Sequence, residues 1–321
     1  MKLKKISMIG IIIFAVFALY IFVTGGTSYL ANIIVYICLF VIAGQGWNLL
    51  GGYIGEISFG HAVFFGIGSY AVGIPMAYKW NLPIPVLILL GVALSAGFAL
   101  AISWPLFRVK GFPFLIGTFG LGVVFLSIFK SSQKLYANKG IYITSIPLKA
   151  SYLLIAGMAI GSTIFVAWLV NTNLGLKFQA VRDAPEAAEM VGINLYRTKA
   201  IALVIGAALT GLAGCMFAFY SMHITPSTCF ETGISNDILL GSYVGGCGTA
   251  LGPVIGAFVV LGLQEWARGI ITISGGHNLL LGILLIVVMM AAREGIWPGI
   301  LKLAKKAAAR RNRQNTETLK E

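Results

Sequence analysis

Apolar and polar positions follow one another in long blocks along this chain. Several apolar blocks run for about 20 residues without a charge, the length an α-helix needs to cross a bilayer. The expected spans are Ser7–Val23 (a retained first helix rather than a cleaved leader), Leu30–Leu50, a segment within His61–Tyr78, Pro83–Phe107, Phe112–Lys130, Tyr152–Val170, Ala200–Met222 and Leu279–Trp297.

One further apolar stretch, Asp237–Arg268, is interrupted by the sequence GGCGTALGP. Glycine and proline end or kink helices, so this stretch predicts a re-entrant hairpin or two short helices. The predicted fold class is therefore all-α: a polytopic membrane protein of about 8–10 transmembrane helices with re-entrant or broken helices. We expect residues 1–321 to form a single membrane domain.

The composition agrees with the pattern. The chain is 58% hydrophobic and 10% charged, with a mean hydropathy of +0.92. Soluble domains carry about a quarter charged residues, so a soluble globular protein is excluded. The 40 glycines suit closely packed membrane helices, in which small residues let backbones approach one another.

The net charge of +13 is concentrated at the two ends of the chain. The basic residues there are Lys2, Lys4, Lys5, Lys302, Lys305, Lys306, Arg310, Arg311, Arg313 and Lys320. The positive-inside rule places both ends, including a tail at about 299–321, in the cytoplasm, where anionic lipid also attracts them. No basic face carries interleaved aromatic residues, so nucleic-acid binding is not expected.

A compact charged segment, FQAVRDAPEAAEMVGIN (Phe178–Asn194), lies in a loop at about 171–199 that the orientation places in the cytoplasm. Asp183 followed by Glu186 predicts a capping box, and Gly192 predicts the end of a short helix. The residues expected on one small apolar face are Ala184, Ala187, Ala188 and Val191. Such a face with acids beside it suits a groove on another protein; a solvated surface helix is the alternative.

Polar residues gather at a glycine-rich segment after the second span. They are Gln45, Asn48, Glu56, Ser58 and His61. Glycines there favour a broken helix that lines a cavity or packs on protein. A charge at mid-bilayer costs at least about 2.5–3.5 kcal/mol, so Glu56 should be protonated, paired or facing water. We expect these residues on a translocation pathway; the alternative puts Glu56 and His61 at the inner headgroups.

Gly245 and Gly246 begin the glycine-rich break in the later stretch. They are candidates for the pathway or a gate, with tight helix packing as the alternative. Asp237 is expected to cap a helix that begins at Ile238, and Thr118 to bond its own backbone. No metal site is expected, because His61 has no partner at ligand spacing.

Four stretches in matching order resemble the permease subunits of branched-chain amino-acid ABC transporters. The charged segment is similar to their cytoplasmic EAA loop, in which E-A-A-x-x-x-G stands here at 186–192. The other three stretches are NLLGGYIGEISFGHAVFFGIGSY (Asn48–Tyr70), GGCGTALGPVIGA (Gly245–Ala257) and REGIWPGI (Arg293–Ile300). The likeness covers most of the chain.

The resemblance implies an ATP-driven importer of branched-chain or related small amino acids in the inner membrane. It implies a second related permease, two cytoplasmic ATP-binding subunits and a soluble or lipid-anchored substrate-binding protein as partners, with membrane lipid around them. It also implies that the EAA-type segment couples to the ATPases, with Arg182, Asp183, Glu186, Ala187, Ala188 and Gly192 as the coupling residues.

ATP chemistry and cofactors are not expected in this chain, which has no G-x-x-x-x-G-K-[ST] phosphate loop. The alternative function is a proton-coupled secondary transporter of a small polar solute, with Glu56 carrying the proton. A membrane enzyme ranks third, because the sequence offers no Ser/His/Asp set, metal cluster or paired carboxylates.

Overall fold

A computed structural model describes residues 28–80, 82–109, 111–132, 140–143, 147–270, 282 and 295–300. The expected span Ser7–Val23 and the basic tail beyond residue 300 lie outside these residues, as does nearly all of the expected span Leu279–Trp297.

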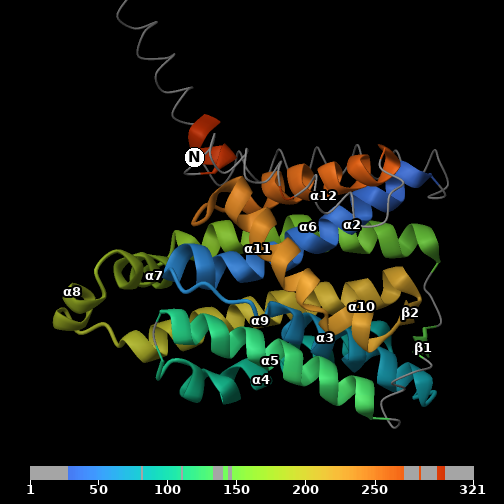
Figure 1. Cartoon of the computed structure of the whole chain (residues 1–321), viewed down its shortest axis with the longest axis horizontal. Coiled ribbons are helices and arrows are strands. Elements are labelled where there is room, and N and C mark those ends of the chain that lie inside the picture. Colours follow the sequence, from blue (N-terminus) through green and yellow to red (C-terminus); the bar gives the residue numbers. More distant parts are fainter. Residues whose placement is uncertain are drawn as a thin grey trace, which may run out of the picture.

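The described chain is almost entirely helical. Its helices are α2 (Tyr29–Asn48), which continues as the π-helix η1 (Leu49–Ile54), α3 (His61–Ala77), α4 (Ile84–Leu106), α5 (Phe112–Ser131), α6 (Leu148–Val170), α7 (Asn173–Asp183), α8 (Pro185–Met190), α9 (Leu195–Ser221), α10 (Pro226–Phe230), α11 (Thr232–Gly246) and α12 (Gly252–Ile270). Two short strands, β1 (Ile141–Tyr142) and β2 (His223–Ile224), pair antiparallel. The long helices run side by side along one axis, and α7 and α8 lie at one end of the bundle (Figure 1).

Within the described residues, five helical stretches are long and apolar enough to cross a membrane: α2 with η1, α4, α5, α6 and α9. Two shorter apolar helices, α3 and Gly252–Ala267 of α12, accompany them. The all-α polytopic fold class is therefore confirmed. Each of these helices coincides with an apolar block of the sequence. An apolar block inside a bilayer forms a helix because its backbone groups must hydrogen-bond to one another.

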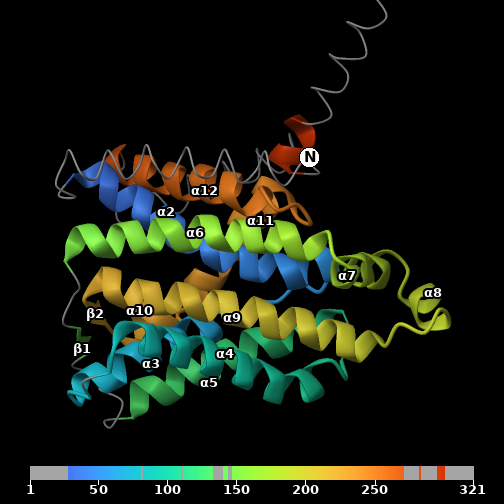
Figure 2. The same cartoon turned by 180° about the vertical axis from the view of Figure 1, so that it is seen from behind.

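Helix α9 occupies the centre and packs against α2, α3 and α4. Small residues make these contacts possible. A Cβ atom on Gly68 of α3 would collide with the carbonyl oxygen of Gly211 in α9, and one on Gly46 of α2 would collide with that of Gly206. Seen from behind, α9 and α6 run along the length of the bundle (Figure 2). The abundance of glycine in the sequence thus serves close helix packing.

We expect Gly214→Ala to destabilise the protein, because the added methyl group would collide with the backbone carbonyl of Phe65 and lie 3.0 Å from the amide nitrogen of Ser69. Overpacking of this kind costs about 1–3 kcal/mol. Gly161→Ala is the matched control, since nothing lies within 4 Å of its Cβ position. Thermal denaturation of the detergent-purified proteins should separate the two variants; equal midpoints would contradict the assigned contact.

The helices at the two glycine-rich segments are broken, as the sequence predicts. After η1 the chain turns back, and the Ser58 carbonyl accepts a hydrogen bond from Trp47 Nε1 at 2.8 Å, so that α3 begins part-way along the bundle. Helices α11 and α12 form an antiparallel hairpin in which Gly245 meets Gly252 and Gly241 meets Gly256. The prediction of two short helices is confirmed there. Asp237 lies inside α11 and does not cap a helix, because α11 begins five residues earlier, at Thr232.

Candidate functional site

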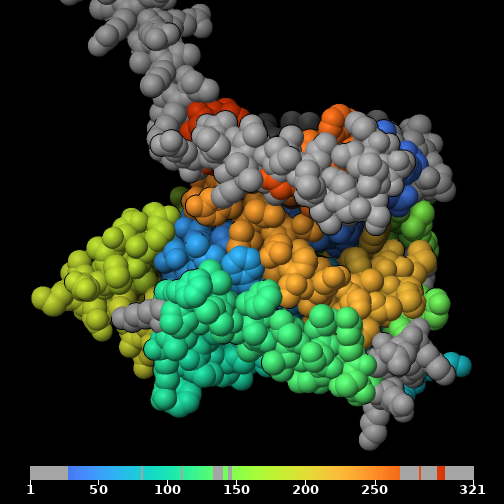
Figure 3. All heavy atoms as spheres, in the orientation of Figure 1, coloured from blue at the N-terminus to red at the C-terminus, as the bar shows by residue number. Residues whose placement is uncertain are grey.

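The charged segment forms α7, α8 and the connection to α9. Phe178 and Val181 of α7 are buried against the bundle, whereas α8 protrudes from its end (Figure 1). The space-filling view shows the same segment as a protrusion of the surface (Figure 3). We call residues 171–199 the coupling loop, after the role that the resemblance implies for them.

The bend between α7 and α8 lies at Ala184, whose φ of −153° and ψ of 80° are not helical. Pro185 follows it, and the α region is disfavoured for a residue that precedes proline. Asp183 is therefore the last residue of α7 and caps nothing: the predicted capping box with Glu186 is wrong, and α8 has no side-chain cap at its N-terminus. The Asp183 carboxylate instead accepts a hydrogen bond from Arg182 Nε at 2.9 Å, in an exposed ion pair.

The end of α8 is built as the sequence predicts. Gly192 has a φ of 85°, which glycine adopts without steric cost. Its amide donates to the Glu189 carbonyl at 2.9 Å, and the Ile193 amide donates to the Ala188 carbonyl at 3.0 Å. These two bonds make a Schellman motif, which fixes the end of this short helix.

The small face of α8 is divided. Ala188 is buried against the bundle, with 3% of its surface exposed, and so cannot face a partner as predicted. The outward side holds Ala184, Ala187, Met190 and Val191, of which Met190 is 89% exposed. We call these four residues the α8 face. The acids Glu186 and Glu189 are also exposed.

Arg182 connects the coupling loop to the broken helix. Its Nη1 donates to the carbonyl oxygen of Gly52 in η1 at 3.1 Å. A Cβ on Gly55 would lie 3.1 Å from Arg182 Cγ, and one on Gly248 would lie 2.8 Å from Arg182 Nη1. The Arg182 side chain thus lies between the π-helix and the turn that joins α11 to α12. π-helical turns are frequent at functional sites.

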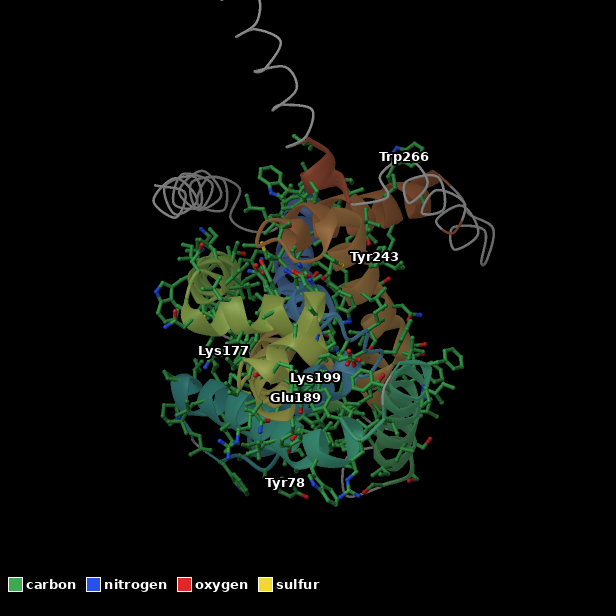
Figure 4. The ribbon with its side chains drawn as sticks, turned by 90° about the vertical axis from the view of Figure 1, so that its left-hand side faces the viewer. Tyr78, Lys177, Glu189, Lys199, Tyr243 and Trp266 are labelled. Atoms are coloured by element: carbon green, nitrogen blue, oxygen red, sulfur yellow. The ribbon has the colours of Figure 1, made fainter. Side chains whose placement is uncertain are left out.

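Glu56, the residue singled out as an intramembrane acid, is paired. Its carboxylate forms an ion pair with the ammonium group of Lys199 near the start of α9, and each side chain is less than a fifth exposed. Unlike the pair between the adjacent residues Arg182 and Asp183, this ion pair joins distant parts of the chain. Figure 4 views the end of the molecule that carries Lys177, Glu189 and Lys199.

Gln45 and Asn48 hold the turn between α11 and α12. Asn48 Nδ2 donates to the Thr249 carbonyl at 2.9 Å, and its Oδ1 accepts from the Gly248 amide at 2.9 Å. Gln45 Nε2 donates to the Ala250 carbonyl at 2.7 Å. These two side chains therefore fasten α2 to the turn, and the structure brings together the two glycine-rich segments that the sequence singled out separately.

Ser58 and His61 are both buried at the start of α3. Ser58 Oγ accepts a hydrogen bond from the Gly60 amide at 3.2 Å. Both ring nitrogens of His61 lack a hydrogen-bond partner in the described structure, and its ring packs edge-on against Phe64 at a centroid distance of 5.7 Å. Thr118 bonds the Leu115 carbonyl of its own helix, as predicted, and also accepts from the Phe59 amide at 3.1 Å.

Gly245 and Gly246 lie in tight contacts, which agrees with the packing alternative. A Cβ on Gly245 would collide with the Gly252 carbonyl. Gly246 has a φ of 124°, and a Cβ there would lie 2.6 Å from Pro298 Cδ. The described part of the REGIWPGI ending, residues 295–300, therefore packs through Pro298 on the glycine-rich break.

Sequence reasoning missed two features of the site. Asn194 caps α9, because its Oδ1 accepts from the Arg197 amide at 2.9 Å. Helix α9 consequently begins at Leu195 rather than at Ala200, and Lys199 lies within it. Asparagine before an apolar run was a usable capping signal. No local signal could pair Lys199 with Glu56, which are 143 residues apart.

The comparisons with known proteins agree with this architecture. The family described as "Branched-chain amino acid transport system / permease component" matches residues 29–289. The high-affinity branched-chain amino acid transport system permease protein LivM of Escherichia coli K12 is 24% identical over 333 residues, covering 92% of this chain and 75% of LivM.

Two other relatives are similar over shorter ranges. The permease protein LivH of the high-affinity branched-chain amino acid transport system of Salmonella typhimurium LT2 is 26% identical, covering 78% of this chain and 88% of LivH. The autoinducer 2 import system permease protein LsrC of Enterobacter sp. 638 is 30% identical, covering 63% of this chain and 60% of LsrC. No solved structure matches. Since the family match runs from the start of α2 to beyond α12, this chain belongs to the branched-chain amino acid transport system permease component family, whose members are multi-pass membrane permeases and not enzymes.

Proposed function

We propose that this chain is a permease subunit of an ATP-driven importer in the inner membrane, and that it carries branched-chain or related small amino acids into the cell. It works with a second related permease, two cytoplasmic ATP-binding subunits and a soluble or lipid-anchored substrate-binding protein. Both chain ends and the coupling loop face the cytoplasm.

One observation carries the proposal: a short helix outside the apolar bundle is attached to a broken helix inside it. Helix α8 exposes Met190 and Val191 to 89% and 77% at the end of an otherwise apolar bundle. On either side of α8, Arg182 bonds η1 and Lys199 pairs with Glu56 just after η1. Displacement of α8 would therefore act on η1 through Arg182 and on the segment just after η1 through Lys199.

The α8 face is suited to a groove on an ATP-binding subunit. Its alanines allow close approach, Met190 and Val191 supply apolar surface, and Glu186 and Glu189 lie beside them to pair with basic residues at a rim. The Schellman end holds α8 as a unit. We assign Arg182, Ala187 and Gly192 to coupling directly, Glu186 to the rim, and Ala188 to fastening α8 on the bundle. Asp183 acts only through its exposed pair with Arg182.

The names of the relatives support the substrate class. LivM and LivH are permeases of branched-chain amino acid systems, whereas LsrC is a permease for autoinducer 2 import. The assignment of amino acids as substrates follows the family description. We also propose that a set of residues at the junction of the two broken segments lines or gates the route of the substrate. They are Gln45, Asn48, Glu56, Ser58, His61, Gly245 and Gly246.

Proton-coupled transport by the chain alone is not favoured by the position of Glu56. A proton carrier would have to leave its ion pair with Lys199 in every cycle, and the pair also ties α9 to the segment after η1. No described observation supports that alternative.

The test is reconstitution into vesicles with the candidate partner subunits and the binding protein. We expect uptake of L-leucine only when ATP is inside together with both ATP-binding subunits. Uptake by the permease without them, driven by a pH gradient, would overturn the proposal in favour of a secondary transporter.

A further inference from the structure

A cavity of about 510 Å³ lies in the half of the bundle opposite α8. It is bordered by the Tyr29 end of α2, the Tyr220 end of α9, α10 and the first turns of α11. This size is typical of sites for small molecules. None of the coupling-loop residues lines it, so it is separate from the site described above.

One wall of the cavity is a continuous aromatic surface. Its members are Tyr36, Phe40, Phe65, Phe217 and Tyr220. Neighbouring rings lie at centroid distances of 5.0 Å (Tyr36–Phe40), 6.3 Å (Tyr36–Tyr220), 6.5 Å (Phe217–Tyr220) and 5.2 Å (Phe65–Phe217). Aromatic faces bury an apolar group and attract a cation.

Other parts of the lining are polar and acidic. Ser227 and Thr228 belong to α10, and Glu231 forms the break between α10 and α11. Asp237 and Glu265 also line the cavity. The described lining residues include these three acids but no lysine, arginine or histidine.

We propose that this cavity is a solute-binding site that recognises an ammonium group attached to a small apolar body. The ammonium group lies between the ring faces and the Glu231 carboxylate, and the apolar body rests on the aromatic wall. A solute whose only charge is negative is repelled by the Glu231 carboxylate. The proposal builds on the proposed importer function, since the site lies at the end from which an incoming solute would arrive.

Discontinuous helices recur at solute sites of membrane transporters, because their ends leave polar groups free inside the bundle. Glu231 lies between two such helices as an exposed residue: it follows α10 and precedes α11, with φ −63° and ψ 138°. The next glycine, Gly233, also lines the cavity, and nothing lies within 4 Å of its Cβ position. A larger side chain at this position would therefore extend into unoccupied space at the border of the cavity.

Direct binding provides the first test. The probes are 3-methylbutylamine and 3-methylbutanoate, which share an apolar body and carry opposite charges. With the purified complex, we expect the amine to bind and the acid to bind at least about tenfold more weakly, a difference of about 1.4 kcal/mol. Gly233→Leu should abolish amine binding by filling the cavity, and Glu231→Gln should weaken it. The proposal would be overturned if the two probes bound with equal affinity. It would also be overturned if the Gly233→Leu variant bound the amine as tightly as the wild type does.

Transport provides the second test, with Gly161→Leu as the matched control. Gly161 lies in α6, has nothing within 4 Å of its Cβ position and does not line the cavity. In vesicles with all partners, Gly233→Leu should reduce L-leucine uptake at least about tenfold, whereas Gly161→Leu should leave it unchanged. Stimulation of ATP hydrolysis by the loaded binding protein should persist in Gly233→Leu.

The two tests distinguish a failure of the importer proposal from a failure of the cavity proposal. Absence of ATP-dependent uptake in the wild type would contradict the importer function, whatever the probes do. Normal uptake by Gly233→Leu in a working transporter would contradict the cavity proposal alone.

Discussion

Ala187→Trp is expected to detach the ATP-binding subunits from the permease without removing the permease from the membrane. Ala187 is exposed on the α8 face and lies outside the helices that are long enough to cross the membrane, so insertion and folding should be unaffected. In a close-fitting groove, an indole in place of a methyl group would overlap with the partner. The amount of ATP-binding subunit that co-purifies should fall at least about tenfold, equivalent to about 1.4 kcal/mol of binding free energy.

Ala150→Trp is the control for this experiment. Ala150 is also an exposed alanine in a first turn, but it belongs to α6 at the end opposite α8. We expect this variant to retain its ATP-binding subunits. If the Ala187→Trp permease also co-purified with its ATP-binding subunits and took up substrate normally, α8 would be only a solvated surface helix.

Lys199→Glu is expected to abolish most transport, because it places a second carboxylate beside Glu56. Both native side chains are less than a fifth exposed, and loss of one partner from a largely buried ion pair destabilises by about 3–5 kcal/mol. The segment after η1 would separate from α9. We expect uptake in vesicles to fall well over about tenfold, with a lower denaturation midpoint.

The exchanged pair, Glu56→Lys with Lys199→Glu, distinguishes pairing from other roles. It restores opposite charges at the same two positions, so a large part of both stability and uptake should return. Lys177→Glu makes the same charge change at an exposed position of the coupling loop and should retain the stability of the wild type. Recovery of stability without uptake would assign Glu56 a role in the pathway beyond pairing, and recovery of neither would contradict the pairing argument.

The membrane spans and the coupling loop could be predicted from the sequence because their signals are local. An apolar block of about 20 residues can satisfy its backbone in a bilayer only as a helix, so α4, α5 and α6 appear close to where they were expected. Gly192 predicted the end of α8 because the positive φ required there is a property of a single residue. The breaks at η1 and between α11 and α12 were predicted for the same reason, through their glycines.

Predictions that required a choice between neighbouring residues were less successful. The sequence offers both Asp183 and Ala184 as the N-cap residue of α8. Because Pro185 disfavours the helical conformation for the residue before it, Ala184 is the N-cap. Ala187 and Ala188 are indistinguishable in sequence. Only contact with the bundle buries Ala188 and leaves Ala187 exposed.

The sequence by itself thus determined the all-α membrane fold, the position of its charged loop at 171–199 and the breaks in its helices, because each depends on residues close together in the chain. The tertiary structure alone decided which polar groups meet. Lys199 reaches Glu56, and Arg182 reaches Gly52, across 143 and 130 residues. These contacts depend on how whole helices pack against one another. That packing is the sum of many small contacts, such as Gly68 on Gly211, and no single segment of the sequence determines it.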